Sequence, residues 1–203
     1  MGELILVRHG ETEWSRTGQY AGRTDIPMTE AGRAAVGRLA PVFAARPVTA
    51  AYASPADRAV QSAALIGLPG VRTDEDLWEW DYGGYEGLTE QQIEATRPGW
   101  DLWRDGVIPG DSAHPGESVE QVGARIDAVL GRVEPLLAGG DVVLVLHGHL
   151  QRVLAARWLG LPPEAGRLFA HPHTATISIL TSEHDRPVLG CWNVRADSVV
   201  GGQ

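Results

Sequence analysis

The sequence has no lysine, and all seventeen of its basic residues are arginine. This absence excludes P-loop nucleotide hydrolases, which need a Walker A lysine, and enzymes that form a Schiff base through a lysine amine. Each cation of the chain is instead a planar guanidinium that stays charged and binds phosphate or carboxylate oxygens in pairs. The basic residues are therefore suited to anionic ligands.

Cysteine and long apolar runs are also scarce. Cys191 is the only cysteine, which excludes an internal disulfide and offers no thiolate cluster for zinc. No run approaches the roughly 18 apolar residues of a membrane span, and residues 1–3 lack the charged and apolar regions of a secretion signal. The net charge of -9 disfavours a nucleic-acid partner, which would need a basic face. We expect a cytoplasmic protein that binds neither membranes nor nucleic acids.

What the chain does have is an alternation of strand and helix patterns in 203 residues, 43% of them hydrophobic, which suits one domain. The alternation favours a mainly parallel sheet. Strands are expected at residues 4–7, 48–53, 142–146, 174–181 and 187–194. Helices are expected at residues 29–43, 57–67, 88–95, 118–137 and 150–159, with a break near Pro135.

Two of the expected strands end in basic or imidazole side chains. The apolar run at residues 4–7 leads into Arg8 and His9, and the run at residues 142–146 leads into His147. Ligands of open α/β sheets bind outside the carboxyl ends of the strands, so these side chains stand at a candidate anion site. For either segment alone, a solvated turn is the simpler interpretation.

A third basic residue and an acidic segment extend this candidate site. Arg58 falls in the first turn of the helix expected at residues 57–67, where backbone amides and the helix dipole favour anions, although a solvated arginine is the more common case. Residues 77–87 mix three carboxylates with tryptophan, tyrosine and glycine. A carboxyl group between Trp78 and Trp80 would be partly desolvated, which raises its pKa and suits a general acid. A surface loop with aromatic anchors explains the same composition equally well.

Four segments, in this order, resemble the motifs of the histidine phosphatase superfamily, which includes phosphoglycerate mutases, fructose-2,6-bisphosphatase and many acid phosphatases. They are Arg8-His9-Gly10-Glu11-Thr12, Ser54-Pro-Ala-Asp-Arg58-Ala-Val-Gln-Ser62, Leu77-Trp-Glu-Trp-Asp-Tyr-Gly-Gly-Tyr-Glu-Gly87 and His147-Gly148. The resemblance spans residues 4–160 and implies a three-layer α/β/α sandwich of the phosphoglycerate mutase type. It further implies a single domain, residues 1–203, with a lid-like excursion at about residues 80–116.

The resemblance also implies roles for individual residues. The implied catalytic residues are Arg8, His9, Arg58, Glu79 and His147. The implied substrate contacts are Thr12, Ser15, Gly22, Tyr82, Gly148 and His149. Glu86 and Asp81 are weaker candidates for the proton donor than Glu79. The acidic segment and the His-Gly-His element are most similar to those of bacterial acid phosphatases once named as mutases.

These residues suggest a phosphoryl-transfer site that needs neither a metal nor a cofactor. Two guanidiniums and a protonated His147 would supply the charge that other enzymes take from magnesium. Neutral His9 would attack phosphorus, and Glu79 would protonate the departing alkoxide and then activate water. We therefore expect a phosphatase that hydrolyses small-molecule phosphate monoesters through a phosphohistidine, of the broad or acid phosphatase kind.

Three alternatives stay open. A bisphosphoglycerate-dependent phosphoglycerate mutase must hold a second phosphate, and the excursion offers only Arg97 and Arg104, which are separated in sequence. A non-catalytic module that binds phospho-ligands would be expected to lack the nucleophile or the acid. A metal site built on His171 and His173 together with the His-Gly-His segment lacks a completing carboxylate cluster. A homodimer is compatible with the sequence.

Overall fold

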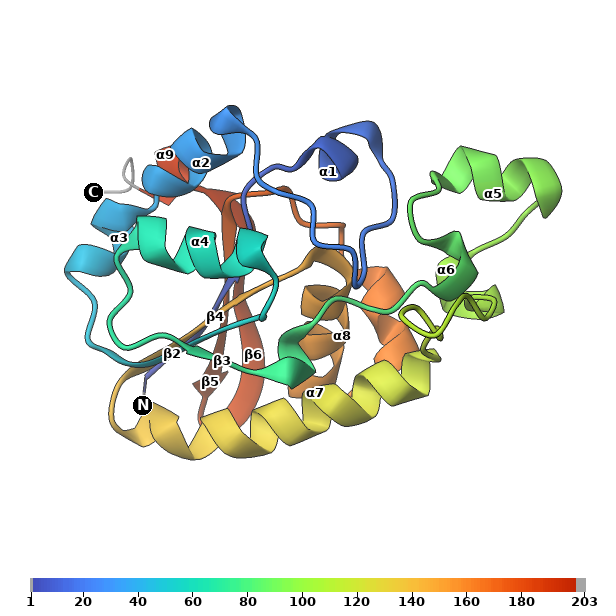
Figure 1. The fold of residues 1–203 in the computed structure, drawn as a ribbon. Coiled ribbons are helices and arrows are strands. Elements are labelled where there is room, and N and C mark those ends of the chain that lie inside the picture. Colours follow the sequence, from blue (N-terminus) through green and yellow to red (C-terminus); the bar gives the residue numbers. More distant parts are fainter. Residues whose placement is uncertain (1, 200–203) are drawn as a thin grey trace.

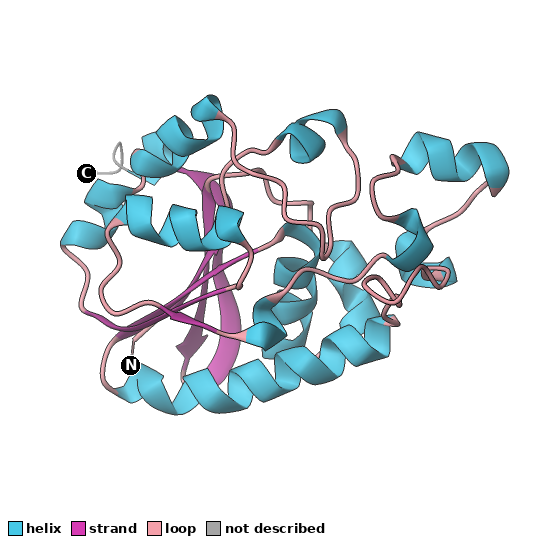
Figure 2. Cartoon of the chain, in the orientation of Figure 1, coloured by secondary structure: helices cyan, strands magenta, loops and turns pink. Residues whose placement is uncertain are grey.

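The computed structural model describes residues 2–199, so residue 1 and residues 200–203 of the expected domain lie outside the description. A six-stranded sheet stands at the centre, with helices packed on both of its faces (Figure 1). Figure 2 shows the strands enclosed between these two groups of helices. The expected α/β sandwich with a mainly parallel sheet is confirmed.

Five strands of the sheet run in one direction, and β5 runs opposite to them. In spatial order the sheet runs β3-β2-β4-β1-β5-β6. The first four run parallel, and β5 pairs antiparallel with both β1 and β6. The strands are β1 (Leu4–Arg8), β2 (Val48–Ala53), β3 (Arg72–Thr73), β4 (Asp141–Leu146), β5 (Thr176–Glu183) and β6 (Arg186–Arg195).

The register between the two central strands decides where the candidate site forms. β1 and β4 are parallel neighbours, and Arg8 pairs with Leu146. The next residues, His9 and His147, therefore leave the sheet side by side. The backbone amide of His9 extends the pairing by donating to the carbonyl oxygen of Leu146 at 3.1 Å.

Helices cover both faces of the sheet, with α2, α3 and α4 on one face and α7 and α8 on the other (Figure 1). The α-helices are α1 (Glu13–Thr17), α2 (Glu30–Gly37), α3 (Ala40–Ala44), α4 (Asp57–Ile66), α5 (Glu90–Thr96), α6 (Leu102–Asp105), α7 (Val119–Val133), α8 (Gly148–Trp158) and α9 (Ala196–Val199). The 3-10 helices are η1 (Glu75–Leu77), η2 (Gly83–Tyr85), η3 (Glu134–Ala138) and η4 (Pro163–Leu168). None of the described helices combines the length and the apolar character that crossing a membrane requires.

Alternation along the strands divides the core in two. Successive side chains of a strand point to opposite faces of the sheet. Leu4 and Leu6 therefore pack in the cluster that contains α7 and α8, whereas Ile5 and Val7 pack in the cluster that contains α2, α3 and α4. Both faces of β1 are thus buried, which explains its continuous apolar sequence.

The prediction of one helix over residues 29–43 is wrong. The helix divides, because α2 ends at Gly37 and α3 begins at Ala40. Pro41 lies in the first turn of α3, where its missing N–H and fixed φ are tolerated. Inside one continuous helix the same proline would remove a hydrogen bond and clash with the preceding turn.

Other element boundaries agree more closely with the sequence. The break predicted at Pro135 is confirmed, because α7 ends at Val133 and passes into η3. The last two strands lie within a few residues of their expected positions. The segment between β1 and α2, for which no helix was expected, contains the short helix α1.

The excursion at residues 80–116 contains η2, α5 and α6. The two helices lie together at the right of Figure 1, on the side away from α2 and α3. Trp100 and Trp103 anchor the segment, because both are buried in the cluster shared with α7 and α8. Trp80 meets Trp103 edge-on, with ring centroids 5.4 Å apart. A lid function for this segment stays a prediction.

Candidate active site

The two histidines of the expected site meet at the carboxyl ends of β1 and β4. The ring centroids of His9 and His147 lie 5.1 Å apart, and the ring planes are inclined at 63°. Both side chains are buried. The structure thus joins segments near opposite ends of the sequence in one place.

His9 has the geometry of a neutral nucleophile. Its Nδ1 lies 2.7 Å from the carbonyl oxygen of Gly10, which can only accept, so Nδ1 carries the proton and Nε2 carries the lone pair. Burial, and then the charges of Arg58 and Arg8, hold the pKa of His9 well below its usual value. The imidazole is therefore uncharged near neutral pH.

Arg58 extends from the first turn of α4 and is 1% exposed. Its Nη2 donates to the carbonyl oxygens of Ala21 and Gly22 at 3.2 and 3.1 Å. Its Nη1 donates to the carbonyl oxygen of Thr24 at 2.8 Å and lies 3.4 Å from Oδ1 of Asp25. Four of the five N–H groups are thus occupied, and only Nε has no partner among the described residues.

Three buried nitrogen atoms of the expected phosphate ligands have no hydrogen-bond partner within the described part of the chain. They are Nε of Arg8, Nε of Arg58 and Nδ1 of His147. The buried amide of Gln151 is the other unpartnered group found there. A buried polar group without a partner costs about 1–3 kcal/mol. An oxyanion is the ligand that would satisfy two guanidiniums and an imidazole together.

The surroundings of His147 favour its neutral form in the protein by itself. Burial, and then the neighbouring Arg58, His9 and Arg8, hold the pKa of His147 well below its usual value. Its Nε2 lies 2.7 Å from Oγ of Ser54. The expectation of a protonated His147 concerns the ring beside a phosphate and stays a prediction.

Glu79 lies against the N-terminus of α8. Its Oε2 accepts from the amide of His149 at 3.0 Å, and its Oε1 accepts from the amides of Leu150 at 2.8 Å and Trp80 at 3.0 Å. The carboxyl group is buried. Of the two flanking tryptophans, Trp80 is fully buried, whereas Trp78 is partly exposed and donates to a surface carboxylate.

The two weaker candidates for the proton donor have structural partners. Asp81 accepts from the amide of Gly83 at 2.9 Å. Glu86 accepts from the amides of Gly22 and Thr24 at 2.9 and 3.0 Å. Neither carboxylate lines the cavity beside His9.

A cavity of about 600 Å³ opens beside His9. The catalytic candidates on its wall are Arg8, His9 and Glu79. The expected substrate contacts on its wall are Thr12, Ser15, Tyr82 and His149. Arg58 and His147 are buried and do not form part of the wall, and neither do Gly22 and Gly148.

Gly22 and Gly148 allow close packing around the site. A Cβ atom on Gly148 would lie 2.5 Å from Cε1 of His171 and 3.2 Å from Cζ of Arg8. A Cβ atom on Gly22 would lie 2.4 Å from the carbonyl oxygen of Trp80. Any larger residue would displace a neighbour of the site, so these glycines act through packing in the structure.

Thr12 and Ser15 are tied to each other as the cap of α1. Oγ1 of Thr12 accepts from the amide of Ser15 at 3.1 Å, and Oγ of Ser15 accepts from the amide of Thr12 at 2.9 Å. This reciprocal pair forms a capping box and fixes both hydroxyls on the cavity wall. Their contact with substrate stays a prediction.

Sequence reasoning missed Tyr20 and Arg152, which also line the cavity. The ring of Tyr20 lies 4.6 Å from that of Tyr82, and the guanidinium of Arg152 lies 4.6 Å above the ring of Trp103. Arg152 follows Gly148 by four residues on α8. This spacing indicates that the two residues lie on the same face of the helix. Tyr20 lies in an irregular loop and gave no such signal.

His149 and His171 form a second histidine pair on the wall. Their ring centroids lie 4.7 Å apart, and Nδ1 of His149 lies 2.7 Å from the hydroxyl of Tyr82. Burial, and then the charges of Arg8 and Arg152, lower the pKa of His171 to about 3. Within residues 2–199, no group of three or more histidine, cysteine, aspartate or glutamate side chains is arranged to hold a metal ion.

Comparison with known proteins agrees with this arrangement. The family model of the histidine phosphatase superfamily (branch 1) matches residues 4–195. An acid phosphatase of Mycobacterium tuberculosis is 38% identical over 89% of this chain and 87% of the relative. A sedoheptulose 1,7-bisphosphatase of Saccharomyces cerevisiae is 34% identical over 77% of this chain and 67% of the relative. A probable phosphoglycerate mutase of Yersinia enterocolitica is 34% identical over 82% of this chain and 79% of the relative.

Solved structures share the fold over nearly the whole chain. The structure of an open reading frame from Mycobacterium tuberculosis matches with a TM-score of 0.88 and 35% identity, and the match covers 96% of this chain and 98% of that chain. The relatives named as phosphatases support a phosphatase, which is a hydrolase. The segments that carry the two histidines, Arg58 and Glu79 all lie inside the region that the family model matches. The chain belongs to the histidine phosphatase superfamily, branch 1.

Proposed function

We propose that the protein hydrolyses small-molecule phosphate monoesters through a phosphohistidine on His9. The observation that carries this proposal is the set of three buried, unpartnered nitrogens on Arg8, Arg58 and His147 around a neutral imidazole. Phosphoryl transfer asks mainly for positioning, for charge compensation at the non-bridging oxygens and for an in-line nucleophile. The guanidiniums of Arg8 and Arg58 supply that compensation from the protein itself.

The reaction proceeds in two displacements. Nε2 of His9 attacks phosphorus, the bond from phosphorus to the alcohol oxygen breaks, and the carboxyl group of Glu79 gives its proton to that oxygen. The alcohol leaves, and phosphohistidine and the Glu79 carboxylate stay behind. Glu79 then takes a proton from water, the water oxygen attacks phosphorus, and the bond from phosphorus to His9 breaks to release inorganic phosphate.

His147 takes up a proton when the substrate binds. In the protein by itself burial and two guanidiniums keep it neutral. A doubly negative phosphate ester beside the ring favours the charged form and raises the pKa. His147 then donates from Nδ1 to a phosphate oxygen, which completes the set of donors around phosphorus.

The nucleophile is tested by replacing His9 with alanine and measuring release of inorganic phosphate. His9→Ala is expected to abolish hydrolysis, whereas His184→Asn, an exposed histidine on the β5–β6 turn, is expected to keep the wild-type rate. Rapid quenching of the wild-type enzyme with labelled substrate should trap a phosphoryl group that is labile in acid and stable in base. Substantial residual hydrolysis by His9→Ala would remove the assignment.

A phosphoglycerate mutase is the second candidate, and the relative from Yersinia enterocolitica carries that name. The cations of the excursion do not support it. Arg97 donates to the hydroxyl of Tyr85, Arg104 pairs with Asp105, and neither lines the cavity. An assay of bisphosphoglycerate-dependent isomerisation beside phosphate release separates the two functions. Isomerisation without appreciable hydrolysis would favour the mutase.

A phosphatase and a non-catalytic binding module need different side chains at the site. A module that only binds phospho-ligands needs the two guanidiniums but neither a free nucleophile nor an acid. Here His9 and Glu79 both face the cavity, and His9 is held in the neutral form that attacks phosphorus. The substrate consistent with these groups is a small-molecule phosphate monoester, hydrolysed with broad tolerance.

A further inference from the structure

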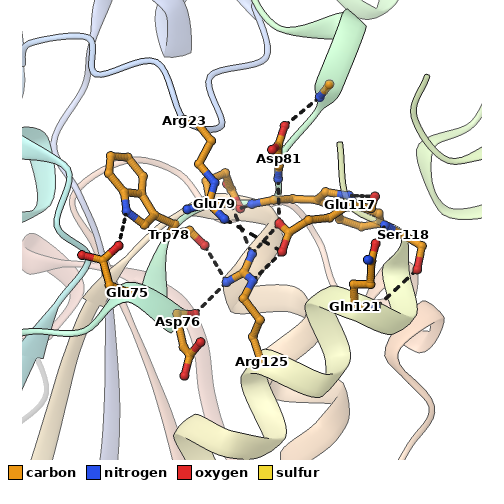
Figure 3. A network of polar contacts seen from close by, with 12 residues as sticks. Arg23, Glu75, Asp76, Trp78, Glu79, Asp81, Glu117, Ser118, Gln121 and Arg125 are labelled. Carbon is orange, nitrogen blue, oxygen red and sulfur yellow. Dashed lines mark hydrogen bonds and ion pairs between the residues drawn. The ribbon is translucent and has the colours of Figure 1, made fainter. Parts of the chain in front are cut away.

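The backbone that carries Glu79 is held by one arginine of the neighbouring helix α7. Arg125 reaches from α7 to the chain at residues 76–79, as Figure 3 shows. We propose that Arg125, fixed by Glu117, is a positioning residue that holds the Glu79 carboxyl group at the leaving-group side of the site. The proposal rests on the proposed function, because it assigns Glu79 its role as proton donor.

All five N–H groups of Arg125 are occupied. Nη1 donates to the carbonyl oxygens of Asp76 and Trp78 at 2.6 and 2.9 Å. Nη2 donates to the carbonyl oxygen of Glu79 at 3.3 Å and to Oε2 of Glu117 at 2.8 Å. Nε donates to Oε1 of Glu117 at 2.7 Å. A lysine has three donors on one atom and cannot reproduce this fork.

Glu117 fixes the other side of the same segment. Its Oε2 accepts from the amide of Asp81 at 2.9 Å, and its own amide donates to the carbonyl oxygen of Asp81 at 3.0 Å. Its carbonyl oxygen accepts from Nε1 of Trp80 at 2.8 Å. Glu117, just before α7, and Arg125 on α7 therefore hold the chain on both sides of Glu79.

Arg125 and Glu117 form a largely buried ion pair. The side chains of Arg125 and Glu117 are 12% and 13% exposed. Burial by itself raises the pKa of Glu117, but the hydrogen bonds and charge of Arg125 outweigh it and leave that pKa below its usual value. Removal of only one partner leaves an uncompensated charge in a largely buried position, which destabilises the protein. Both residues are therefore needed to fix the segment.

Glu79 is consequently fixed at two points. Its backbone carbonyl is bound by Arg125 from α7, and its carboxylate is bound by the first amides of α8. The hydrogen bonds of Arg125 reach none of the phosphate ligands, although its charge is the smallest of the causes that lower the pKa of His147. Arg125 therefore acts mainly through the acid.

The test is the dependence of the rate on the leaving group. Hydrolysis of 4-nitrophenyl phosphate needs little general acid, because nitrophenolate leaves without a proton, whereas hydrolysis of glycerol phosphate needs it fully. We compare kcat/KM, which reports the step in which the alcohol departs. The variants are Arg125→Lys, the paired variant Arg125→Met with Glu117→Gln, Glu79→Gln, and the control Arg157→Lys, an arginine of α8 whose hydrogen bonds go to Asp127 and to the carbonyl oxygen of Leu161.

General acid catalysis contributes roughly 10²- to 10⁴-fold, so Glu79→Gln should lose about that factor with glycerol phosphate and little with nitrophenyl phosphate. Arg125→Lys should lose about 10-fold and the paired variant about 10²-fold with glycerol phosphate, and each less than about 3-fold with nitrophenyl phosphate. Arg157→Lys should match the wild type with both substrates. The paired variant keeps the test decisive if Arg125→Lys is poorly folded, because it leaves no lone buried charge.

Two outcomes overturn the inference. An equal loss of kcat/KM with both substrates in the Arg125 variants would mean a general structural role or an effect on the phosphate ligands. No loss of kcat/KM with either substrate would mean that Arg125 has no role in the reaction. Failure of the proposed function looks different, because the wild type would then release no phosphate or Glu79→Gln would show no dependence on the leaving group.

Discussion

Arg58 is the residue on which the proposed phosphate site depends most directly. We expect Arg58→Lys to lower kcat/KM about 10²- to 10³-fold, the usual effect of losing one donor to a transition-state oxyanion. Lysine keeps the charge but cannot bind the loop carbonyls and a phosphate oxygen at once. The measurement is phosphate release at substrate concentrations below KM.

The matched control for Arg58 is Arg33→Lys, because Arg33 is an exposed arginine of α2 that contacts Gln61. The kcat/KM of Arg33→Lys should equal that of the wild type. If Arg58→Lys kept more than about a tenth of the wild-type kcat/KM, Arg58 would not be a phosphate ligand of this importance.

Residue positions were easier to predict from the sequence than residue charges. The convergence of His9 and His147 followed from two apolar strands with similar endings, because parallel neighbours end at one edge of the sheet. The charge of His147 could not be predicted in that way. It depends on full burial and on the distance to Arg58 and Arg8, which only the folded chain sets.

At the scale of elements, the loop before α2 is held between two charged groups. Glu86 accepts from the amides of Gly22 and Thr24, and Arg58 donates to carbonyl oxygens of the same loop. In Glu86→Gln an NH2 group replaces Oε2, which accepts from the amide of Gly22 at 3.1 Å, and the negative charge beside the loop is lost. We expect a loss of about 1–3 kcal/mol of unfolding free energy and a fall of about 10-fold in kcat/KM, in the range that a misplaced site group produces.

The fall in kcat/KM of Glu86→Gln should be equal for nitrophenyl phosphate and glycerol phosphate. The reason is that the loop positions the phosphate ligand Arg58 and not the proton donor Glu79. Glu94→Gln, an exposed glutamate of α5, serves as the control and should leave rate and stability unchanged. A loss confined to glycerol phosphate would show that Glu86 acts through the proton donor instead.

Local sequence rules explain which elements were predictable. Pro41 carried enough information to predict the division between α2 and α3, since proline is tolerated only in the first turn of a helix. The cap of α1 was less visible, because Ser15 replaces the usual glutamate or glutamine of a capping box. The contact of Arg125 with residues 76–79 joins chain segments 46 to 49 positions apart, which no local pattern reveals.

At the scale of the whole molecule, the site places four histidines in one region of the fold, and two of them, His9 and His147, are buried. Burial holds the pKa values of His9, His147 and His149 well below the usual value and lowers that of His171 to about 3. In the unfolded chain each imidazole has a pKa of about 6.5. Below that pH the unfolded state binds more protons than the folded state, so the free energy of unfolding falls as the pH falls.

We therefore expect the melting temperature to decrease from pH 7 to pH 5, a range in which few carboxyl groups titrate. Each of the two buried histidines, His9 and His147, contributes up to about 1.4 kcal/mol per pH unit, whereas solvent screening makes the contribution of the exposed His171 smaller, over a window from about 6.5 down to its folded pKa of about 3. Calorimetry over this range measures the slope. His171→Asn should reduce it, since one proton-binding difference is removed, whereas His184→Asn, at an exposed turn, should leave it unchanged. A melting temperature that is constant or rises toward pH 5 would contradict the neutral state of these rings, and with it the neutral His9 that the proposed attack on phosphorus requires.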